Sequence, residues 1–368
     1  MPYCRRCGTK LEEDARFCHK CGTPVAATYA PTPPISQPAP AAYGSPAPAR
    51  MKPWHKDALV LASIGLVTIL VVAAVAAALL TATIGSWDLN QSLEDKTPGV
   101  KTINLNFQTN IGRVDIFTQK IPGNNIGIYV QANGSRGLFA NNTNPVSISF
   151  ENQTVGDVLT VNSQIRVEEP AVSRASIQCT IYVDPALKLN LNVSSTTGQV
   201  SFTGEQDAKI QALTLHAVTG EVQANLNTGV TVNGNVSLST TTGEVNYRMY
   251  QTYVVDNCTL NLRSVKGEVT IDITQTKTLQ GNLSVTADTT TGAINVGLTV
   301  DGGVGAQIAS DTTGFGNIHT DLKNFNGNQS LVQSANYPSA CNIEIENTIH
   351  GFGSVYVTAS YLTTVVSS

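Results

Sequence analysis

The hydrophobic and polar positions divide the chain into unlike parts, of which the largest begins near residue 101. From there onward apolar and polar residues alternate in short runs, as in Thr102–Phe107, Arg113–Phe117 and Ile126–Val130. Alternation with a period of two, interrupted by Gly, Asn and Pro, is typical of β-strands with one buried face. No segment after residue 90 has the period of an amphipathic helix. The pattern predicts a mainly β fold for residues 101–368.

A glycine-centred element recurs within this part. The marker glycines follow one another at spacings of 22, 23, 24, 25 and 22 residues: Gly198, Gly220, Gly243, Gly267, Gly292 and Gly314. A period of this size predicts a solenoid, in which each repeat covers its neighbour's apolar face. Stacking would place Val200, Val222, Val245, Val269 and Ile294 in one interior column, and Phe202, Ala224, Tyr247, Ile271 and Val296 in another. Each marker glycine would supply a positive φ, and the residues before it would form a ladder: Thr197, Thr219, Thr242, Lys266, Thr291 and Thr313.

The repeated elements, among them STTGQVSF (195–202) and TTTGEVNY (240–247), resemble those of the DUF4097-like adhesin family of β-solenoids. The lead-in IYVDPALKLNLNVSSTTGQVSF (181–202) is also similar to that family. The resemblance covers roughly residues 101–368 and is strongest over 187–322. It implies a parallel β-helix without established catalytic residues. Residues 101–185 lack the marker except near Gly112, and we expect an N-terminal cap of irregular strands there.

Residues 58–86 have a different pattern. No charged residue lies between Ala58 and Ser86, and the centre of the stretch is almost entirely aliphatic. About 20 apolar residues suffice for a helix to cross a bilayer, so a transmembrane helix is predicted, with Trp54 and Trp87 as interfacial anchors. A long buried helix of a soluble domain is the alternative.

Charges beside this stretch predict its orientation. Basic residues precede it (Arg50, Lys52 and Lys56), and acidic residues follow it (Asp88, Glu94 and Asp95). The positive-inside rule then predicts a single-pass plasma-membrane protein with a cytoplasmic N-terminus and an extracellular C-terminal domain. Residues 87–100 would form a neck, and residues 25–53, rich in Pro and Ala, a disordered linker.

The strongest chemical signal lies in residues 1–24. Two Cys-x2-Cys-Gly pairs, Cys4/Cys7 and Cys18/Cys21, are separated by ten residues. Four thiolates at this spacing predict one tetrahedral zinc ion, and because all four ligands are cysteines the site would be structural. The segment is similar to the short zinc ribbons at the N-termini of prokaryotic membrane proteins. Two disulfides are the alternative, which a cytoplasmic location disfavours.

Charge is distributed unevenly along the chain. Residues 1–57 carry 8 Lys/Arg and 4 Asp/Glu (+4), whereas residues 88–368 carry 14 and 22 (−8). An acidic domain repels phosphates, which argues against a nucleic-acid partner for it. Nucleic-acid binding by the basic N-terminal segment stays open as an alternative to partner-protein contact.

Several other side chains are candidates for chemistry. Three cysteines alternate along the predicted strands in step with core residues: Cys179, Cys258 and Cys341. They are expected to be unpaired buried thiols, and one disulfide among them is the alternative. Glu221, Glu244 and Glu268 would form a solvated column, with a cation site as the alternative. His216, His319 and His350 are expected on the surface or in turns. Nine Asn-x-Ser/Thr sequons after residue 86 are compatible with glycosylation.

These features favour a membrane-anchored, adhesin-like protein that displays the β-solenoid to a protein or glycan outside the cell. The zinc ribbon would contact a cytoplasmic protein. A transmembrane sensor or scaffold that couples the two domains is a second hypothesis, and a β-helix enzyme acting on glycans is a third. Because no nucleophile elbow, phosphate loop or dinucleotide motif occurs in the sequence, we expect a protein that is not an enzyme.

Overall fold

The computed structural model describes Lys10, Lys20 and residues 69–74, 83–137, 145–168 and 172–362. The chain divides into two compact units, Met1–Val67 and Thr68–Ser368, and every strand named below belongs to the second. The predicted zinc ligands, the linker (25–53) and Trp54 lie outside the described residues.

Within the described residues, 24 strands form two mixed sheets. The 11-stranded sheet contains, in spatial order, β1 (Thr83–Asp95), β4 (Ile126–Gly137), β7 (Val172–Val183), β3 (Arg113–Thr118), β9 (Val200–Gly204), β11 (Val222–Leu226), β13 (Val245–Tyr250), β16 (Val269–Gln275), β18 (Ile294–Asp301), β24 (Val355–Leu362) and β20 (Ile318–Lys323). The 13-stranded sheet contains β21 (Phe325–Gly327), β22 (Leu331–Ser334), β19 (Gly305–Thr312), β23 (Asn342–Phe352), β17 (Leu283–Thr291), β15 (Cys258–Lys266), β12 (Thr231–Thr242), β10 (Lys209–Thr219), β8 (Lys188–Thr197), β2 (Thr102–Ile111), β6 (Val158–Val167) and β5 (Val146–Val155), and β14 (Tyr253–Val254) pairs with β12.

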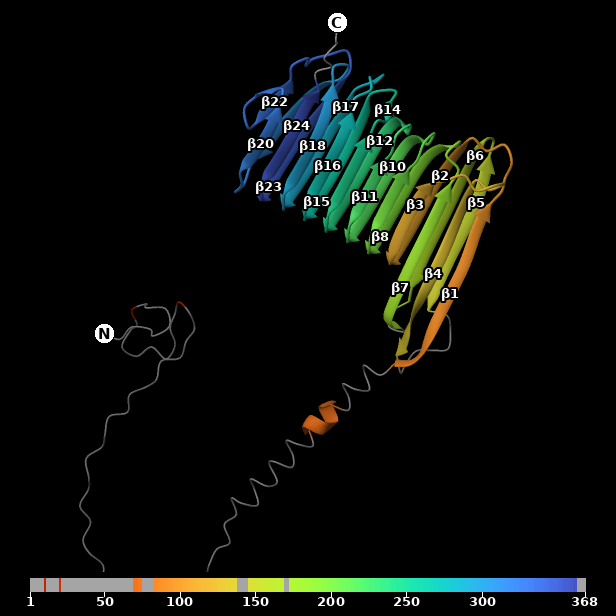
Figure 1. Cartoon of the computed structure of the whole chain (residues 1–368). Helices are drawn as coiled ribbons and strands as arrows, with labels where there is room; N and C mark the ends of the chain where they lie inside the picture. Colours follow the sequence, from red (N-terminus) through yellow and green to blue (C-terminus); the bar gives the residue numbers. More distant parts are fainter. Residues whose placement is uncertain are drawn as a thin grey trace, which may run out of the picture. The chain divides into compact units, whose positions relative to one another are not determined.

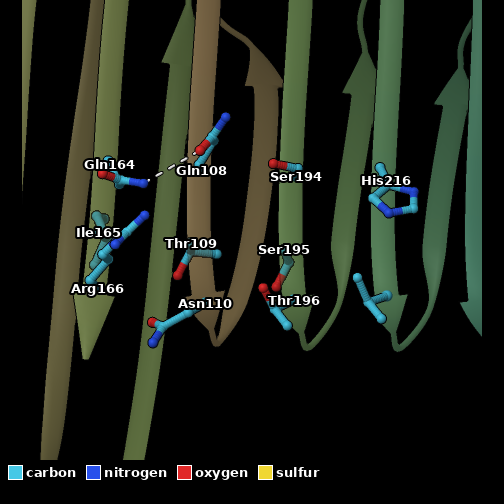
Figure 2. Close-up of a pocket in the computed structure, with 11 residues that line it drawn as sticks. Gln108, Thr109, Asn110, Gln164, Ile165, Arg166, Ser194, Ser195, Thr196 and His216 are labelled. Atoms are coloured by element: carbon cyan, nitrogen blue, oxygen red, sulfur yellow. Dashed lines mark hydrogen bonds between the residues drawn. The ribbon is translucent and has the colours of Figure 1, made fainter. Parts of the chain in front are cut away.

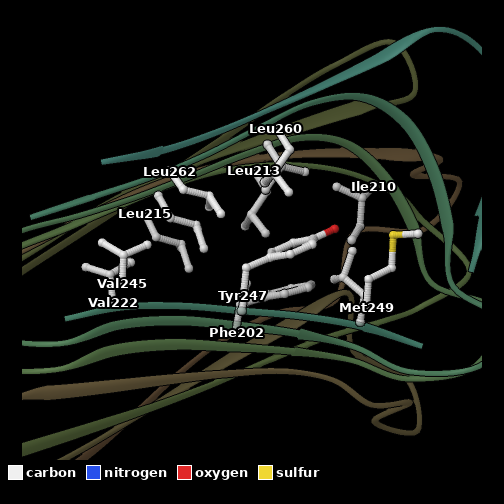
Figure 3. Close-up of a cluster of buried hydrophobic side chains, with 14 of the residues drawn as sticks. Phe202, Ile210, Leu213, Leu215, Val222, Val245, Tyr247, Met249, Leu260 and Leu262 are labelled. Carbon is white, nitrogen blue, oxygen red and sulfur yellow. The ribbon is translucent and has the colours of Figure 1, made fainter. Parts of the chain in front are cut away.

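The repeat seen in the sequence builds the middle of both sheets. Each repeat unit contributes one strand to each sheet and pairs in parallel with the next unit, so that β10–β11 lies beside β12–β13. Alternating apolar residues point between the sheets, where they form one core cluster (Figure 3). Both predicted interior columns are confirmed, since Val222 pairs with Val200 and Val245, and Tyr247 pairs with Ala224 and Ile271.

Glycine forms the corner where a unit passes from one sheet to the other. Gly220 has φ +141°, and an added Cβ would lie 1.9 Å from the carbonyl oxygen of Gly198. The same arrangement recurs at Gly198, Gly243, Gly267 and Gly292. A hydroxyl before the corner binds the glycine carbonyl of the preceding unit: Thr240 Oγ1 donates to Gly220 O (3.0 Å). The predicted positive φ is therefore confirmed at these five glycines, and only glycine fits such a close approach of two backbones.

The prediction for Gly314 is wrong because the last units are not stacked in sequence order. Strands β23 and β24 insert between β17–β18 and β19–β20. The corner glycines, each lying against the carbonyl of the one before it, therefore continue from Gly292 to Gly353 and then to Gly316. Gly316 lies two residues beyond the predicted Gly314. In the predicted ladder of residues before each corner, Thr291 pairs with Phe352, and Phe352 pairs with Phe315. The exposed rings of Phe352 and Phe315 stack with their centroids 5.4 Å apart. Thr313 is therefore not a ladder residue.

A similar insertion occurs at the other end of the sheets. Strands β2 and β3, orange in Figure 1, lie between β6–β7 and β8–β9. Gly112 forms their corner with φ +118°. The predicted cap of irregular strands is wrong, because β2 to β7 are regular strands of 6 to 12 residues.

The predicted parallel β-helix is also wrong as a description of the whole β region. Antiparallel pairs lie at the N-terminal end of both sheets (β1 with β4, β4 with β7, and β5 with β6) and at the C-terminal end of the 13-stranded sheet (β19 with β22 and β21 with β22). The 11-stranded sheet ends on the parallel pair of β24 and β20. The fold is a pair of mixed sheets with a parallel middle.

The predicted transmembrane helix at 58–86 is corrected too. Its last residues, Thr83–Ser86, belong to β1, and Trp87 is a buried residue of that strand rather than an interfacial anchor. The alternation in Trp87-Asp-Leu89-Asn explains this, since it matches a strand paired with β4. Residues 69–74 are helical, residues 58–68 and 75–82 lie outside the described part, and no described helix is long and apolar enough to cross a membrane.

Asp95 links the two sheets at their N-terminal end. Its buried carboxylate accepts hydrogen bonds from Asn125 Nδ2 (2.9 Å), from Asn152 Nδ2 in β5 (2.7 Å) and from the backbone and hydroxyl of Thr97 (3.0 Å each). Burial alone would raise the pKa of Asp95, but these hydrogen bonds outweigh it and lower the pKa below its usual value.

We expect Asp95→Asn to lower the stability of the domain at neutral pH by about 1–3 kcal/mol, because it removes a charged acceptor and leaves donors unpaired. A carboxyl whose folded pKa is depressed stabilises the fold above its unfolded pKa of about 3.9. That contribution is lost as the pH falls through the lower folded value. Denaturant unfolding at pH 7 and pH 3 should therefore show a smaller difference between variant and wild type in acid. Asp321→Asn, on the exposed edge strand β20, is the control, and an equal effect of both variants would contradict the role of Asp95.

Candidate functional site

The outer face of the 13-stranded sheet is a continuous polar surface. One residue from each successive strand lies in register across it, and we call this set the central polar row: Gln164, Gln108, Ser194, His216, Ser239, Arg263, Asp288, Thr348 and Asp311. A neighbouring row contains Asn162, Asn106, Asn192, Thr214, Ser237, Asn261, Thr286 and Glu346. Alternation along each strand puts these side chains outside while their neighbours fill the core.

A groove of about 360 Å³ lies on this face, near the C-terminal ends of β6, β2, β8 and β10 (Figure 2). Its lining is Gln108, Thr109, Asn110, Gln164, Ile165, Arg166, Ser194, Ser195, Thr196, His216 and Val218. The small side chains of β8 lie between the longer side chains of β2 and β10, which produces the hollow. No carboxylate belongs to the described lining.

Some groove residues are already held by the fold. The Asn110 side chain bonds both backbone groups of Val167, donating to its carbonyl and accepting from its amide at 2.9 Å each. His216 Nδ1 is 2.9 Å from Ser239 Oγ, which fixes the ring through one nitrogen. These contacts order the groove and leave the other imidazole nitrogen without a hydrogen bond among the described residues.

Other groups in the groove are available to a ligand. The Gln164 amide bonds in either of two orientations: its oxygen accepts from Arg166 Nε and Nη2 at 3.0 Å, or its nitrogen donates to Gln108 Oε1 at 3.4 Å (Figure 2). The charge-assisted pair at shorter distance is the stronger arrangement.

A second hollow of about 360 Å³ lies farther along the same face, over β12, β15 and β17. Its lining includes Arg263 and Asp288, which are directly opposite in register. The two hollows therefore differ in charge: an acidic residue faces the arginine in this one but not in the groove at Arg166.

The three cysteines of the β region are free. Cys179 and Cys258 are buried, as predicted, whereas Cys341 is only partly buried and packs against the core. Burial, with the nearby charge of Asp115, raises the pKa of Cys179 to about 12, and burial also raises the pKa of Cys258. Both thiols stay protonated at neutral pH, and the disulfide considered as an alternative is absent among these described cysteines.

Two of the three predicted column glutamates accept hydrogen bonds from neutral donors. Glu221 accepts from Gln199 Nε2 (3.0 Å) and Asn246 Nδ2 (2.9 Å), and Glu268 accepts from Thr270 and Asn295. No group of His, Cys, Asp or Glu within the described residues is arranged to hold a metal ion.

The histidines have more specific surroundings than the sequence indicated. His216 lines the groove, His319 stacks on Tyr356 with centroids 5.0 Å apart, and His350 lies 3.8 Å from Asp288. The groove residues themselves were not singled out from the sequence. A signal was present in the similar strands TINLNFQTN and LKLNLNVSSTT, but only pairing in register shows that their polar positions form one surface.

Comparisons with known proteins identify the N-terminal segment. Residues 3–25, which include Cys4, Cys7, Cys18 and Cys21, match the zinc-ribbon domain family. These cysteines lie outside the described residues, but four thiolates in two Cys-x2-Cys pairs are a donor set that fits zinc. A search of curated proteins found no match.

Three solved structures are similar to the β region at 11% identity, each aligned over 74% of this chain. One is a putative cell adhesion protein from Clostridium sporogenes (100% of its chain, TM-score 0.38). The others are putative adhesins from Bacteroides fragilis (97%, 0.27) and Parabacteroides distasonis (97%, 0.20). At such identities and scores these likenesses carry no inference about ligand or role.

Proposed function

We propose that this chain is a non-catalytic, adhesin-like binding protein, in which the outer face of the 13-stranded sheet binds a polar, hydroxyl-rich partner. The observation that carries the proposal is the groove over β6, β2, β8 and β10, because it gathers amide, hydroxyl, guanidinium and imidazole groups in one ordered hollow. Ligand sites are concave and use a few placed polar groups for specificity.

The rigidity of this face supports binding rather than chemistry. The groove side chains stand on paired strands, and Asn110 and His216 are fixed by hydrogen bonds. Glycan hydrolysis ordinarily uses a pair of carboxyl groups, and the described groove lining contains none. A preorganised polar surface of this kind binds with little loss of side-chain entropy.

Filling the groove tests the proposal. We expect Thr196→Trp to reduce binding of the full chain to an oligosaccharide array at least tenfold, because the indole would occupy the hollow over β8. Thr358→Trp, an exposed threonine of β24 on the other sheet, should leave binding unchanged. Unchanged binding by a folded Thr196→Trp protein would exclude the groove as the site.

The N-terminal segment is proposed to carry one structural zinc ion. Cys4, Cys7, Cys18 and Cys21 would hold it, and a site with four thiolates leaves no position for a reacting water. Zinc would order the segment for contact with a partner protein, since ribbons of this size fold only around their metal.

A further inference from the structure

The charge of the groove indicates which polar ligand it takes. We propose that it binds an acidic saccharide, with Arg166 as the anchor for the carboxylate. This inference rests on the proposed binding function and adds the ligand class.

Arg166 is an available cation. None of the ion pairs among the described residues includes it, whereas Arg113 lies 2.6 Å from Asp115 and Arg248 lies 3.6 Å from Asp272. Its side chain is exposed on β6 and belongs to the groove lining. An arginine without a carboxylate partner, in a hollow lined by neutral groups, attracts an anion.

The Gln164 amide orients this guanidinium. When its oxygen accepts from Nε and Nη2, both at 3.0 Å, it fixes the plane of the group and leaves the two Nη1 hydrogens and the second Nη2 hydrogen for a ligand. A planar guanidinium held in this way matches the geometry of a carboxylate, which it binds through two parallel hydrogen bonds.

The rest of the groove offers partners for hydroxyl groups. Gln108, Ser194 and His216 follow Gln164 across β2, β8 and β10 in the central polar row. Three strand spacings separate β6 from β10, a distance of about 14 Å. This length accommodates a short oligosaccharide whose hydroxyls meet the amide, hydroxyl and imidazole groups.

The surrounding charge disfavours a nucleic acid. Such a ligand needs several Lys or Arg contacts to its phosphates, but Arg166 is the only Lys or Arg in the described lining. With 14 Lys/Arg against 22 Asp/Glu, residues 88–368 carry a net charge of −8 and would repel a polyanion. One carboxylate beside one arginine avoids that repulsion.

Titration calorimetry of the full chain tests the proposal with two matched pairs of probes. These are galacturonate with its neutral methyl ester, and 3′-sialyllactose with lactose. We expect at least one acidic probe to bind at least tenfold more tightly than its neutral counterpart, and more weakly as salt is raised. Arg166→Gln should remove that preference, and Arg248→Gln, whose arginine pairs with Asp272 on the other sheet, should keep it.

The outcomes distinguish an error in the ligand class from an error in the binding site. Equal affinity for acidic and neutral probes, or an acid preference that survives Arg166→Gln, would overturn the assignment of Arg166. If binding to neutral saccharides is lost in Thr196→Trp, the groove remains the binding site and only the ligand class is wrong. If none of the four probes binds, the acidic-saccharide assignment fails, and the oligosaccharide array with Thr196→Trp then decides separately whether the groove binds anything.

Discussion

Gly243→Ala is expected to destabilise the β region by about 3–5 kcal/mol. Gly243 has φ +142°, and a Cβ at that position would lie 2.0 Å from the carbonyl oxygen of Gly220. Relief would require the two adjacent corners to separate. That movement would break the bond from Gly220 N to Thr242 O (2.9 Å) and the bond from Thr240 Oγ1 to Gly220 O (3.0 Å).

The matched control is Gly297→Ala in β18. A Cβ there meets its nearest atom at 3.6 Å, an ordinary contact, and φ is not in the left-handed region. We expect a change within about 0.5 kcal/mol, as for most surface substitutions. Denaturant and thermal unfolding followed by circular dichroism measure both variants. Because stacked units can unfold in steps, the unfolding midpoint is the quantity to compare. A Gly243→Ala midpoint equal to that of Gly297→Ala would contradict the close approach of the corners.

The second large effect is expected at the zinc ribbon. Purified full chain should contain one zinc ion, and Cys7→Ser should lose it, because removing one of four thiolates leaves an incomplete tetrahedral site. Elemental analysis together with a thiol titration measures the stoichiometry.

Cys341→Ser is the control for the zinc measurement, since this free thiol of the β region takes no part in the proposed site. It should retain the full zinc content. A wild-type chain purified under reducing conditions without zinc, or a Cys7→Ser chain that keeps it, would contradict the proposed ligand set. The result would bear on Cys4, Cys18 and Cys21 equally, because all four ligands act together.

The sequence predicted the zinc ribbon but not the groove. The cysteine spacing alone indicated a zinc ribbon, and the family match over residues 3–25 agrees. Arg166 and Gln108 carry no such signal, because they lie 58 positions apart in sequence and become neighbours only when β2 pairs with β6. Polar residues on the exposed side of a strand look alike in a sequence whether they line a groove or face open solvent.

The stretch before β1 shows the limit of hydropathy. The absence of charge from Ala58 to Ser86 predicted a spanning helix, but Thr83–Ser86 belong to a strand. Hydrophobicity reports a preference to leave water. It does not determine whether the final residues of an apolar stretch extend a helix or pair with β4.

The sequence by itself determined the strands of the repeat units, the interior columns and five of the glycine corners. Alternation with a period of two and repetition near every 23 residues can both be read from positions along the chain. Tertiary structure alone decided the order of the units. A parallel unit pairs with whichever apolar face and open edge fit it, so β2–β3 and β23–β24 insert between units that are closer in sequence. Tertiary structure also placed Gly316, and not Gly314, among the stacked corner glycines. The two glycines lie two residues apart, so alternation along the chain does not distinguish them. Only packing does, because Phe315 stacks on Phe352 and Gly316 lies against Gly353. The groove arises in the same way, from the register that brings small and long polar side chains of four strands together.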